Sequence, residues 1–369
     1  MAKRAVWAEI DLAAIEHNIK EIKKCIHGGA RLCAVVKADA YGHGAAAVAR
    51  KAIEGGASYL AVAVLSEALE LRQAGFTEPI LILGATPVEE SGVLVDYDIT
   101  QTVFTMEAAE ALSKAALHRG KVAKVHLKVD TGMSRIGIRP ELAGELAKQL
   151  SMLPGIELEG MFSHFALSDS RDKSYAKEQL ARFRLAIAKV EEKGVRIPIK
   201  HLANSAAILE MPEAHFDMVR AGVILYGLWP SDEVEHVIDL RPAMKVCAKL
   251  VYIKDMEPGE PISYGCTFHT TRKSRIATIP IGYADGYTRL FAGKAVVELH
   301  GQRVPVVGRI CMDQCMIDVT DVPEAREGDE VVLFGSDTLT TDEAASWLGT
   351  INYEIVCMVS PRVPRMYKA

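Results

Sequence analysis

A single lysine, Lys37, follows a short apolar run in the stretch AVVKADAYGHGA (residues 34–45), and a turn containing glycine and histidine comes directly after it. Lysine is almost never fully buried unless it is paired or chemically used. A lysine in a desolvated pocket has a lowered pKa and becomes a nucleophile that can form an imine with a carbonyl group. The stretch therefore indicates either a buried ion pair or a lysine that reacts.

Other polar residues capable of chemistry also stand where short apolar runs end. They are Tyr41, Lys128 with Arg135 just beyond it, His164, Asn204 with Ser205, and Arg220 with Gly222. Each has an ordinary structural interpretation when taken alone, because a histidine can lie in a core and an arginine can pair with a nearby carboxylate. A common site for all of them requires a fold that brings many strand ends together.

Short apolar runs alternate with helix-like stretches through the first two thirds of the chain, beginning with a helical apolar spacing after the suitable N-cap Asp11. The predicted strands are 31–37, 59–65, 80–84, 99–104, 124–129, 157–163, 198–203 and 217–221. Eight strand–helix units in roughly 220 residues match a (β/α)8 TIM barrel in count and size. A doubly wound sheet is the alternative, although such sheets usually stop at about six strands.

The pattern changes past residue 235, where β-branched residues and Gly, Pro and Asp turns predominate. One helix-like piece, TDEAASWLG (residues 341–349), interrupts these strand-rich segments. The predicted organisation is an N-terminal barrel over residues 1–235 and a C-terminal, mainly-β domain over residues 236–369.

Composition excludes several classes of protein. The 369 residues are 49% hydrophobic and carry a net charge of -5, which gives no long-range attraction to nucleic acid or anionic membranes. No apolar run reaches the roughly 20 residues of a membrane span. The seven cysteines form no CxxC pair and lack zinc-ligand spacing, so we expect reduced thiols and no metal. The segment MAKRAVWAEIDL lacks the apolar core of a signal peptide, which predicts a cytoplasmic location.

In a barrel, chemistry sits at the carboxyl ends of the strands, so the polar residues above would converge on one mouth. Gly222 and Val223 lie where a strand passes to a new helix, and Ser205 opens the preceding helix, so this region suits a bound phosphate. A phosphate site, an imine-forming lysine and an arginine within reach of a ring nitrogen describe pyridoxal phosphate. A lysine-imine aldolase without a cofactor is the alternative on these grounds.

The stretch AVVKADAYGHG resembles the cofactor-lysine signature of alanine racemases, and the likeness continues along nearly the whole chain. It includes VHLKVDTGMSRIG, FSHFA, HLANSAA, VRAGVILYG, ISYGCTF, IPIGYADGY, GRICMDQCMIDVT and INYEIVCM. The first motif and ISYGCTF are together specific, whereas FSHFA alone is not. The resemblance implies a pyridoxal 5'-phosphate enzyme that interconverts L-alanine and D-alanine and supplies D-alanine for peptidoglycan.

The resemblance also implies a role for individual residues. Lys37 would hold the cofactor covalently and act as one of two catalytic bases, and Tyr264 would be the other. Arg220 would hydrogen-bond the pyridine nitrogen, and Arg135 would approach the cofactor phenolate and the substrate carboxylate. His164 would link Arg220 to Tyr264. The residues implied to hold the phosphate are Tyr41, Ser205, Gly222, Val223 and Tyr353.

Further implied roles concern the entrance and one modification. The backbone of Met312 would meet the substrate carboxylate, and Tyr283 and Tyr353 would narrow the entrance. In many members of the family the lysine matching Lys128 is carbamylated, which turns a cation into an anion able to orient Arg135. The resemblance implies a head-to-tail homodimer with shared active sites, in which Tyr264 serves the barrel of the partner chain.

Three other functions are alternatives to this one. A pyridoxal-phosphate decarboxylase usually pairs the ring nitrogen with a carboxylate, so Arg220 argues against it. A non-catalytic, cofactor-binding barrel protein would lack the β domain that carries ISYGCTF. A broad-specificity amino-acid racemase is the hardest to separate, because specificity depends on the pocket volume around Tyr353 and Met312.

Overall fold

The computed structural model describes residues 4–368, and the chain forms two compact units. The barrel unit comprises Ile15–Ala40 and Ala45–Arg241. The β-rich unit comprises the chain up to Ala14, the short segment Tyr41–Gly44, and the chain from Pro242 onward. The predicted boundaries, 1–235 and 236–369, differ from this division at the N-terminus, and residues 1–3 and 369 lie outside the described part.

The barrel unit contains eight parallel strands, one at each predicted position, so the predicted (β/α)8 architecture is confirmed. The strands are β2 (Arg31–Val35), β3 (Tyr59–Val62), β4 (Ile80–Ile82), β5 (Thr100–Val103), β6 (Ala123–Lys128), β7 (Ile156–Phe162), β8 (Ile199–His201) and β9 (Met218–Ala221). Their order is β8-β7-β6-β5-β4-β3-β2-β9. Backbone hydrogen bonds from Asp217 N to Lys200 O and from Arg220 N to Ala203 O, both 3.0 Å, join the two ends of the sheet.

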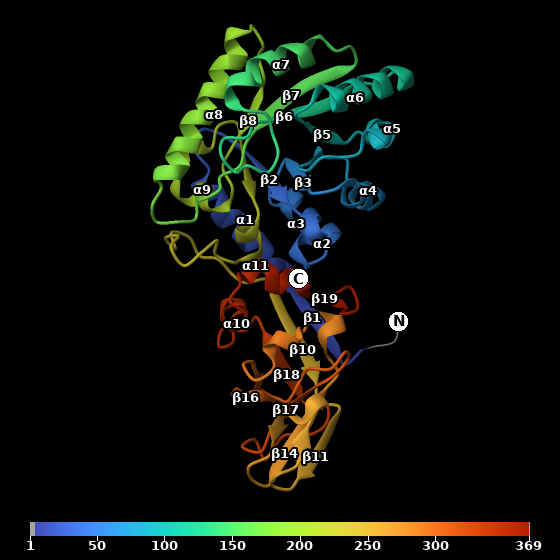
Figure 1. The fold of residues 1–369 in the computed structure, drawn as a ribbon, viewed down its shortest axis with the longest axis vertical. Coiled ribbons are helices and arrows are strands. Elements are labelled where there is room, and N and C mark those ends of the chain that lie inside the picture. Colours follow the sequence, from blue (N-terminus) through green and yellow to red (C-terminus); the bar gives the residue numbers. More distant parts are fainter. Residues whose placement is uncertain (1–3, 369) are drawn as a thin grey trace. The chain divides into compact units, whose positions relative to one another are not determined.

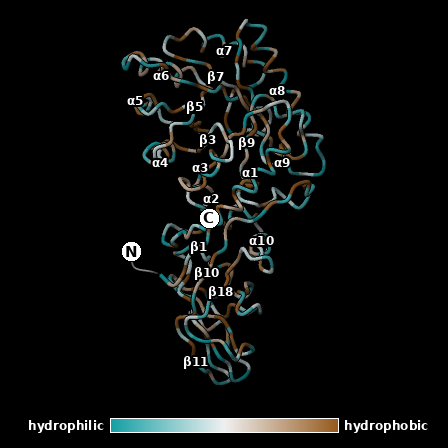
Figure 2. The backbone as a smooth tube through the Cα atoms, turned by 180° about the vertical axis from the view of Figure 1, so that it is seen from behind, coloured by the Kyte–Doolittle hydropathy of each residue, from teal (hydrophilic) through white to brown (hydrophobic). Residues whose placement is uncertain are grey.

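Helices cover the outside of these strands (Figure 1). They are α1 (Leu12–Cys25), α3 (Ala45–Glu54), α4 (Leu65–Gln73), α5 (Ser91–Asp96), α6 (Met106–Arg119), α7 (Ala143–Met152), α8 (Ser174–Glu192) and α9 (Ser205–Glu210). Asp11 Oδ1 accepts a hydrogen bond from Ala14 N at 2.9 Å, which confirms the predicted cap of α1. The strands form the hydrophobic interior of the unit, and polar residues gather on its outer helices (Figure 2).

The β-rich unit is built on a nine-stranded sheet of order β11-β14-β17-β16-β15-β18-β10-β1-β19. Its strands are β1 (Val6–Asp11), β10 (Met244–Lys249), β11 (Tyr252–Met256), β14 (Ser274–Ile279), β15 (Val296–Leu299), β16 (Gln302–Val307), β17 (Cys315–Asp318), β18 (Glu330–Phe334) and β19 (Arg365–Lys368). Strand β1 pairs antiparallel with β10 and parallel with β19. The first strand of the chain therefore belongs to the β-rich unit, and not to the barrel as the predicted boundary implied.

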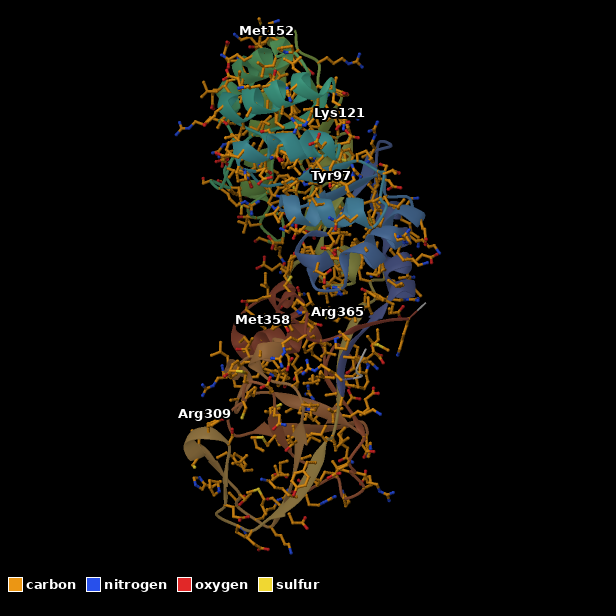
Figure 3. All side chains as sticks on the ribbon, turned by 90° about the vertical axis from the view of Figure 1, so that its right-hand side faces the viewer. Tyr97, Lys121, Met152, Arg309, Met358 and Arg365 are labelled. Carbon is orange, nitrogen blue, oxygen red and sulfur yellow. The ribbon has the colours of Figure 1, made fainter. Side chains whose placement is uncertain are left out.

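Two helices complete the β-rich unit. Helix α10 (Thr341–Leu348) occupies the predicted helical piece, and α11 (Asn352–Met358) follows it. After α11 the guanidinium of Arg365 donates hydrogen bonds to the carbonyls of Val359, Ser360 and Val363 (2.6–2.7 Å), so the chain returns tightly toward β19 (Figure 3). Among residues 4–368, no helix is both long and apolar enough to cross a bilayer.

Candidate active site

Lys37 begins a left-handed turn that starts two residues after β2. The turn, α2 (Lys37–Tyr41), has φ values of 51° to 53° at Ala38, Asp39, Ala40 and Tyr41. Left-handed backbone costs a residue with a side chain about 1–2 kcal/mol. Four such residues in succession persist only where surrounding contacts determine their conformation. This strained segment therefore marks Lys37 as a residue whose position is specified by the fold.

Two carboxylates hold this turn within the barrel unit. Glu67 Oε1 accepts a hydrogen bond from Ala38 N at 2.6 Å, while its Oε2 accepts one from Ala63 N at 2.7 Å. Asp39 Oδ1 accepts a hydrogen bond from Ala45 N at 2.7 Å, at the start of α3. Glu67 thus links the residue after Lys37 to the end of the neighbouring strand β3, a positioning role that the sequence reasoning missed.

The end of the turn belongs to the β-rich unit, where two glycines allow a close approach of the backbone. A Cβ on Gly42 would lie 2.3 Å from Val356 O, and one on Gly44 would lie 1.9 Å from the Tyr367 hydroxyl oxygen. Gly42 O also accepts a hydrogen bond from Arg365 Nε at 2.9 Å. The glycines of the quoted AYGHG motif are therefore explained by packing as well as by their positive φ.

Arg220, at the carboxyl end of β9, is the centre of a buried polar cluster in the barrel unit. Its side chain is 3% exposed, and its Nη1 donates a hydrogen bond to His201 Nδ1 at 2.8 Å. Its Nη2 donates to His164 Nδ1 at 3.3 Å and to the carbonyls of Ser163 and Leu202 at 2.8 and 3.1 Å. Among the described residues, Arg220 Nε has no partner and is the donor left for a ligand.

Burial and mutual repulsion determine the charges in this cluster. Burial lowers the pKa of Arg220 to about 10, so the guanidinium stays charged at neutral pH. Burial, with Arg220 next, lowers the pKa of His164 well below its usual value, which keeps the imidazole neutral. Burial, followed by Arg220, lowers the pKa of Lys128 to about 7, with a further contribution from Arg135. The predicted residues of strand ends β6, β7 and β9 are thus electrostatically coupled.

Lys128 is the last residue of β6 and is 3% exposed. Its Nζ donates a hydrogen bond to Val129 O at 3.1 Å and lies 5.1 Å from the centre of the Phe162 ring. Arg135 is exposed on the loop beyond, which Asp130 shapes by accepting hydrogen bonds from two backbone N–H groups at 3.0 Å. The amine of Lys128 is therefore buried, has a low pKa and forms no ion pair among the described residues, so it can react as a neutral amine.

The predicted phosphate-binding residues of the barrel unit also come together. Ser205 begins α9, whose N-cap Asn204 accepts a hydrogen bond from Ala207 N at 3.2 Å. Gly222 N donates to Ser205 Oγ at 3.0 Å, and Val223 begins the adjoining 3-10 helix, η4 (Val223–Tyr226). A hydroxyl and successive N–H groups at two helix starts are the donor set that an anionic phosphate requires.

In the β-rich unit, the two tyrosines predicted to contact the phosphate are neighbours. The ring centres of Tyr41 and Tyr353 lie 6.1 Å apart with a 49° tilt. Tyr41 is buried, and this burial raises the pKa of its hydroxyl, so the side chain stays a neutral hydrogen-bond donor. Tyr353, on α11, is half-buried.

A second group in the β-rich unit brings together Tyr264, Tyr283 and Met312, all of which are exposed. Tyr264 is 71% exposed, and with Met312 it lines a cavity of about 490 Å³. Tyr283 N donates to Cys311 O at 3.1 Å, so the Tyr283 and Met312 segments are joined by the backbone. Gly282 permits this approach, because a Cβ there would lie 2.3 Å from Cys311 O.

The sequence reasoning identified the residues at strand ends but missed those that hold them. Glu67 and His201 contact the Lys37 turn and Arg220, and neither was singled out. His201 opens the quoted HLANSAA motif at the end of β8, so its place at a predicted strand end was the available signal.

A (β/α)8 barrel with a lysine and a buried arginine at its strand ends, followed by a mainly-β domain, is the architecture of the barrel-fold racemases. Comparison with known proteins agrees. Residues 10–230 match the N-terminal domain family of alanine racemase, and residues 243–367 match its C-terminal domain family.

Individual relatives match over almost the entire chain. An alanine racemase of Desulfovibrio desulfuricans is 58% identical over 99% of this chain and 98% of its own length. The structure of an alanine racemase from Clostridium difficile has a TM-score of 0.97 and 46% identity, covering 100% of this chain and 97% of that one. A Bacillus anthracis alanine racemase with bound L-Ala-P has a TM-score of 0.95 and 40% identity, covering 100% and 96%. The chain belongs to the alanine racemase family, a family of pyridoxal-phosphate-dependent isomerases.

Proposed function

We propose that the chain interconverts L-alanine and D-alanine by a two-base mechanism with pyridoxal 5'-phosphate bound at the carboxyl end of its barrel. One observation carries the proposal: Arg220 is buried on β9, the strand next to β2, which leads into Lys37. Its pKa keeps the guanidinium charged, and among the described residues its Nε is a free donor. Family membership and the identity to curated alanine racemases support the choice of alanine as substrate.

The residues present fit the cofactor. The Ser205 hydroxyl and the N–H groups of Gly222 and Val223 are donors suited to an anion. Lys37 begins a left-handed turn whose strained conformation is held by the surrounding fold. The residues we assign to the cofactor are Lys37 for its covalent attachment, Arg220 for its ring nitrogen, and Tyr41, Ser205, Gly222, Val223 and Tyr353 for its phosphate.

When bound, pyridoxal phosphate withdraws electrons from the substrate Cα and makes its proton removable. Arg220 donates a hydrogen bond to the ring nitrogen and gives up no proton to it, because its pKa lies well above neutral. It thereby limits the electron withdrawal and favours return of the proton to Cα over transamination. His164 accepts a hydrogen bond from Arg220 and helps to hold the guanidinium.

Racemisation requires a base on each face of the substrate Cα. We assign Lys37 to one face and Tyr264 of a second copy to the other. Lys37 takes or returns the proton at Nζ, and Tyr264 does so at its hydroxyl oxygen. The exposure of Tyr264, at 71%, supports a role toward a group outside its own unit.

Substrate binding is assigned to Arg135 and to the backbone N–H of Met312, both acting on the carboxylate. Tyr283 and Tyr353 narrow the entrance, which the exposed position of Tyr283 and the half-buried position of Tyr353 allow. We further assign carbamylation to Lys128, because its lowered pKa supplies the neutral amine that reacts with carbon dioxide.

The assembly we propose is a head-to-tail homodimer with two shared sites. A closed two-fold arrangement makes both sites equivalent, since each copy gives the other its exposed Tyr264 and Met312. The D-alanine product would supply peptidoglycan synthesis, and the cytoplasmic location expected from the sequence is part of this proposal.

One assay tests the function directly. Purified protein loaded with pyridoxal phosphate is incubated separately with L-alanine, L-serine and L-lysine, and D-enantiomer formation is measured, with Lys37→Ala as the matched inactive control. We expect D-alanine to form fastest by a wide margin. Comparable rates on all three substrates would instead indicate a broad-specificity racemase, and no D-enantiomer from any of them would refute the proposed activity.

A further inference from the structure

A continuous column of hydrogen-bonded polar side chains runs through the interior of the barrel unit. Arg220 Nη1 lies 2.8 Å from His201 Nδ1, and His201 Nε2 lies 2.9 Å from His126 Nδ1. His126 Nε2 lies 3.1 Å from Glu159 Oε2, which also accepts a hydrogen bond from the Tyr59 hydroxyl at 2.6 Å. The interior of such barrels is normally filled by branched apolar side chains. Packing alone therefore does not explain the column.

Only one arrangement of protons satisfies the column. An arginine can only donate, so His201 must accept at Nδ1 and must carry its proton on Nε2. That proton requires His126 to accept at Nδ1 and to carry its own proton on Nε2, which Glu159 accepts. The carboxylate of Glu159 thus determines the tautomer of both histidines, and through them the acceptor offered to Arg220.

The charges of the column agree with this arrangement. Burial, then Arg220, lowers the pKa of His201 well below its usual value, and burial lowers that of His126, so both imidazoles are neutral. Burial raises the pKa of Glu159, but the hydrogen bonds from His126 and Tyr59 outweigh it and lower the pKa to about 2. At neutral pH the column therefore consists of a cation, two neutral rings and an anion.

The backbone is shaped around the column. Strand β6 pairs Val125 with Leu158 but His126 with Gly160, so Glu159 is the extra residue of a β-bulge in β7. A Cβ on Gly160 would lie 2.5 Å from both Cε1 and Nδ1 of the His126 ring. The bulge brings the Glu159 carboxylate into the column, and the missing side chain of Gly160 leaves space for the His126 ring. The backbone is thus adapted to these polar side chains.

None of the described groups that accept a hydrogen bond from Arg220 carries a negative charge. Its four hydrogen-bond acceptors are two backbone carbonyls and two imidazole nitrogens, although the side chain is 3% exposed. Buried charges are usually paired directly with an opposite charge. Here the carboxylate of the column, Glu159, is two histidines away from Arg220, and its Oε1 also forms an ion pair with Lys124 Nζ at 3.4 Å.

We propose that His201, His126 and Glu159 are positioning residues for the racemisation: they lock the proton arrangement that makes His201 an acceptor, and so fix the guanidinium of Arg220 at the strand ends. This proposal rests on the role proposed above for Arg220. Loss of the Glu159 acceptor would free His126 to reverse its tautomer, which would turn His201 into a donor facing Arg220.

The first test reads the tautomers directly in the wild-type holoenzyme. Protein labelled with ¹⁵N-histidine is studied by NMR, and the signals are assigned with His126→Gln and His201→Gln. We expect both rings to be neutral, with the proton on Nε2 and a bare Nδ1. A proton on Nδ1 of either ring, or a doubly protonated ring, would overturn the proposal.

The second test compares variants at Glu159. Glu159→Leu should mix the His201 tautomers and lower kcat on the order of tenfold, the lower end of losses seen for outer partners of functional groups. Glu159→Gln keeps an acceptor oxygen and should preserve both tautomers and most of kcat. The exposed Glu157 on the same strand gives the matched control, Glu157→Gln, which should behave as the wild type.

Tyr59→Phe separates positioning from stability. It removes the second donor to Glu159, so it should lower the thermal unfolding midpoint while leaving tautomers and kcat unchanged. If Glu159→Leu keeps wild-type kcat and wild-type tautomers, or if Tyr59→Phe lowers kcat as much as Glu159→Leu does, the column is only structural. Wild-type activity in Arg220→Gln would instead refute the proposed role of Arg220, so the two failures are distinguishable.

Discussion

The buried amine of Lys128 is expected to carry a carbamate. Burial and the neighbouring Arg220 lower its pKa to about 7, so roughly 90% of the amine is neutral at pH 8, against about 0.4% for an ordinary lysine of pKa 10.4. The reactive fraction is therefore about 200-fold higher than for an ordinary lysine. In the reaction the Nζ lone pair forms a bond to the carbon of CO2, and the π electrons of one C=O bond move onto its oxygen. The nitrogen then releases a proton, which leaves a carbamate anion.

The product reverses the local electrostatics in a favourable direction. Lys128 as a cation is repelled by Arg220 and Arg135, whereas its carbamate is attracted by both. We therefore expect CO2 removal to lower racemase activity several-fold and bicarbonate to restore it, because Arg135 would lose its orienting anion.

The assay is ¹³C NMR of protein equilibrated with ¹³C-bicarbonate at pH 8. One carbamate signal is expected, absent in Lys128→Ala and retained in the matched control Lys200→Arg on β8, whose half-buried Nζ donates to Ile197 O. The signal should decline as the pH falls below 7, since the amine is then protonated. Absence of a signal in the wild type, or its persistence in Lys128→Ala, would refute the reasoning.

Three further outcomes are expected. Borohydride reduction of the holoenzyme followed by peptide mapping should label Lys37 alone, and label on Lys128 or Lys200 would overturn that assignment. Arg220→Glu should let the cofactor ring keep its proton, giving slower racemisation, a new long-wavelength absorbance band and more transamination; a wild-type rate with no new band would contradict this role. Mixing inactive Lys37→Ala with inactive Tyr264→Ala should restore roughly a quarter of wild-type activity, because half of the dimers are mixed and each has one intact site. No recovery after verified subunit exchange would contradict the shared site.

Much of the barrel could be predicted because its signals are local. Each strand is a short apolar run bounded by turn residues, and the structure places all eight within a few residues of the predicted positions. Strand ends in a barrel converge, so Lys128, His164 and Arg220 could be grouped by their positions in the sequence. In the structure Arg220 donates a hydrogen bond to His164 and contributes to the lowered pKa of Lys128.

The organisation of the β-rich unit was harder to predict because its decisive contacts are distant in sequence. Strand β1 follows the alternation of a half-buried strand, but its partners are Ala248 and Arg365, more than 230 residues away. Nothing local in the first eleven residues indicates pairing with the end of the chain rather than with the adjacent barrel.

The left-handed turn after Lys37 shows a different limit of sequence reasoning. Ala38, Ala40 and Tyr41 are residues that ordinarily avoid positive φ, so the sequence favours a right-handed turn there. The turn is held by Glu67, which comes from α4 and accepts a hydrogen bond from Ala38 N, and by Asp39 of the turn itself, which accepts one from Ala45 N at the start of α3.

The column of hydrogen-bonded side chains below Arg220 had no sequence signature for a similar reason. His126 sits in VHLKV, where the strand alternation predicts a buried position but does not say whether an imidazole there has a partner. Its partner, Glu159, reaches the interior only because a bulge adds one residue to β7, and the glycine beside it opens the space. A register shift of one residue moves a side chain from one face of a strand to the other, so the column depends on a backbone irregularity that no local pattern encodes. Strand ends therefore identify which residues can react, whereas hydrogen bonds between distant strands decide how those residues are held and charged.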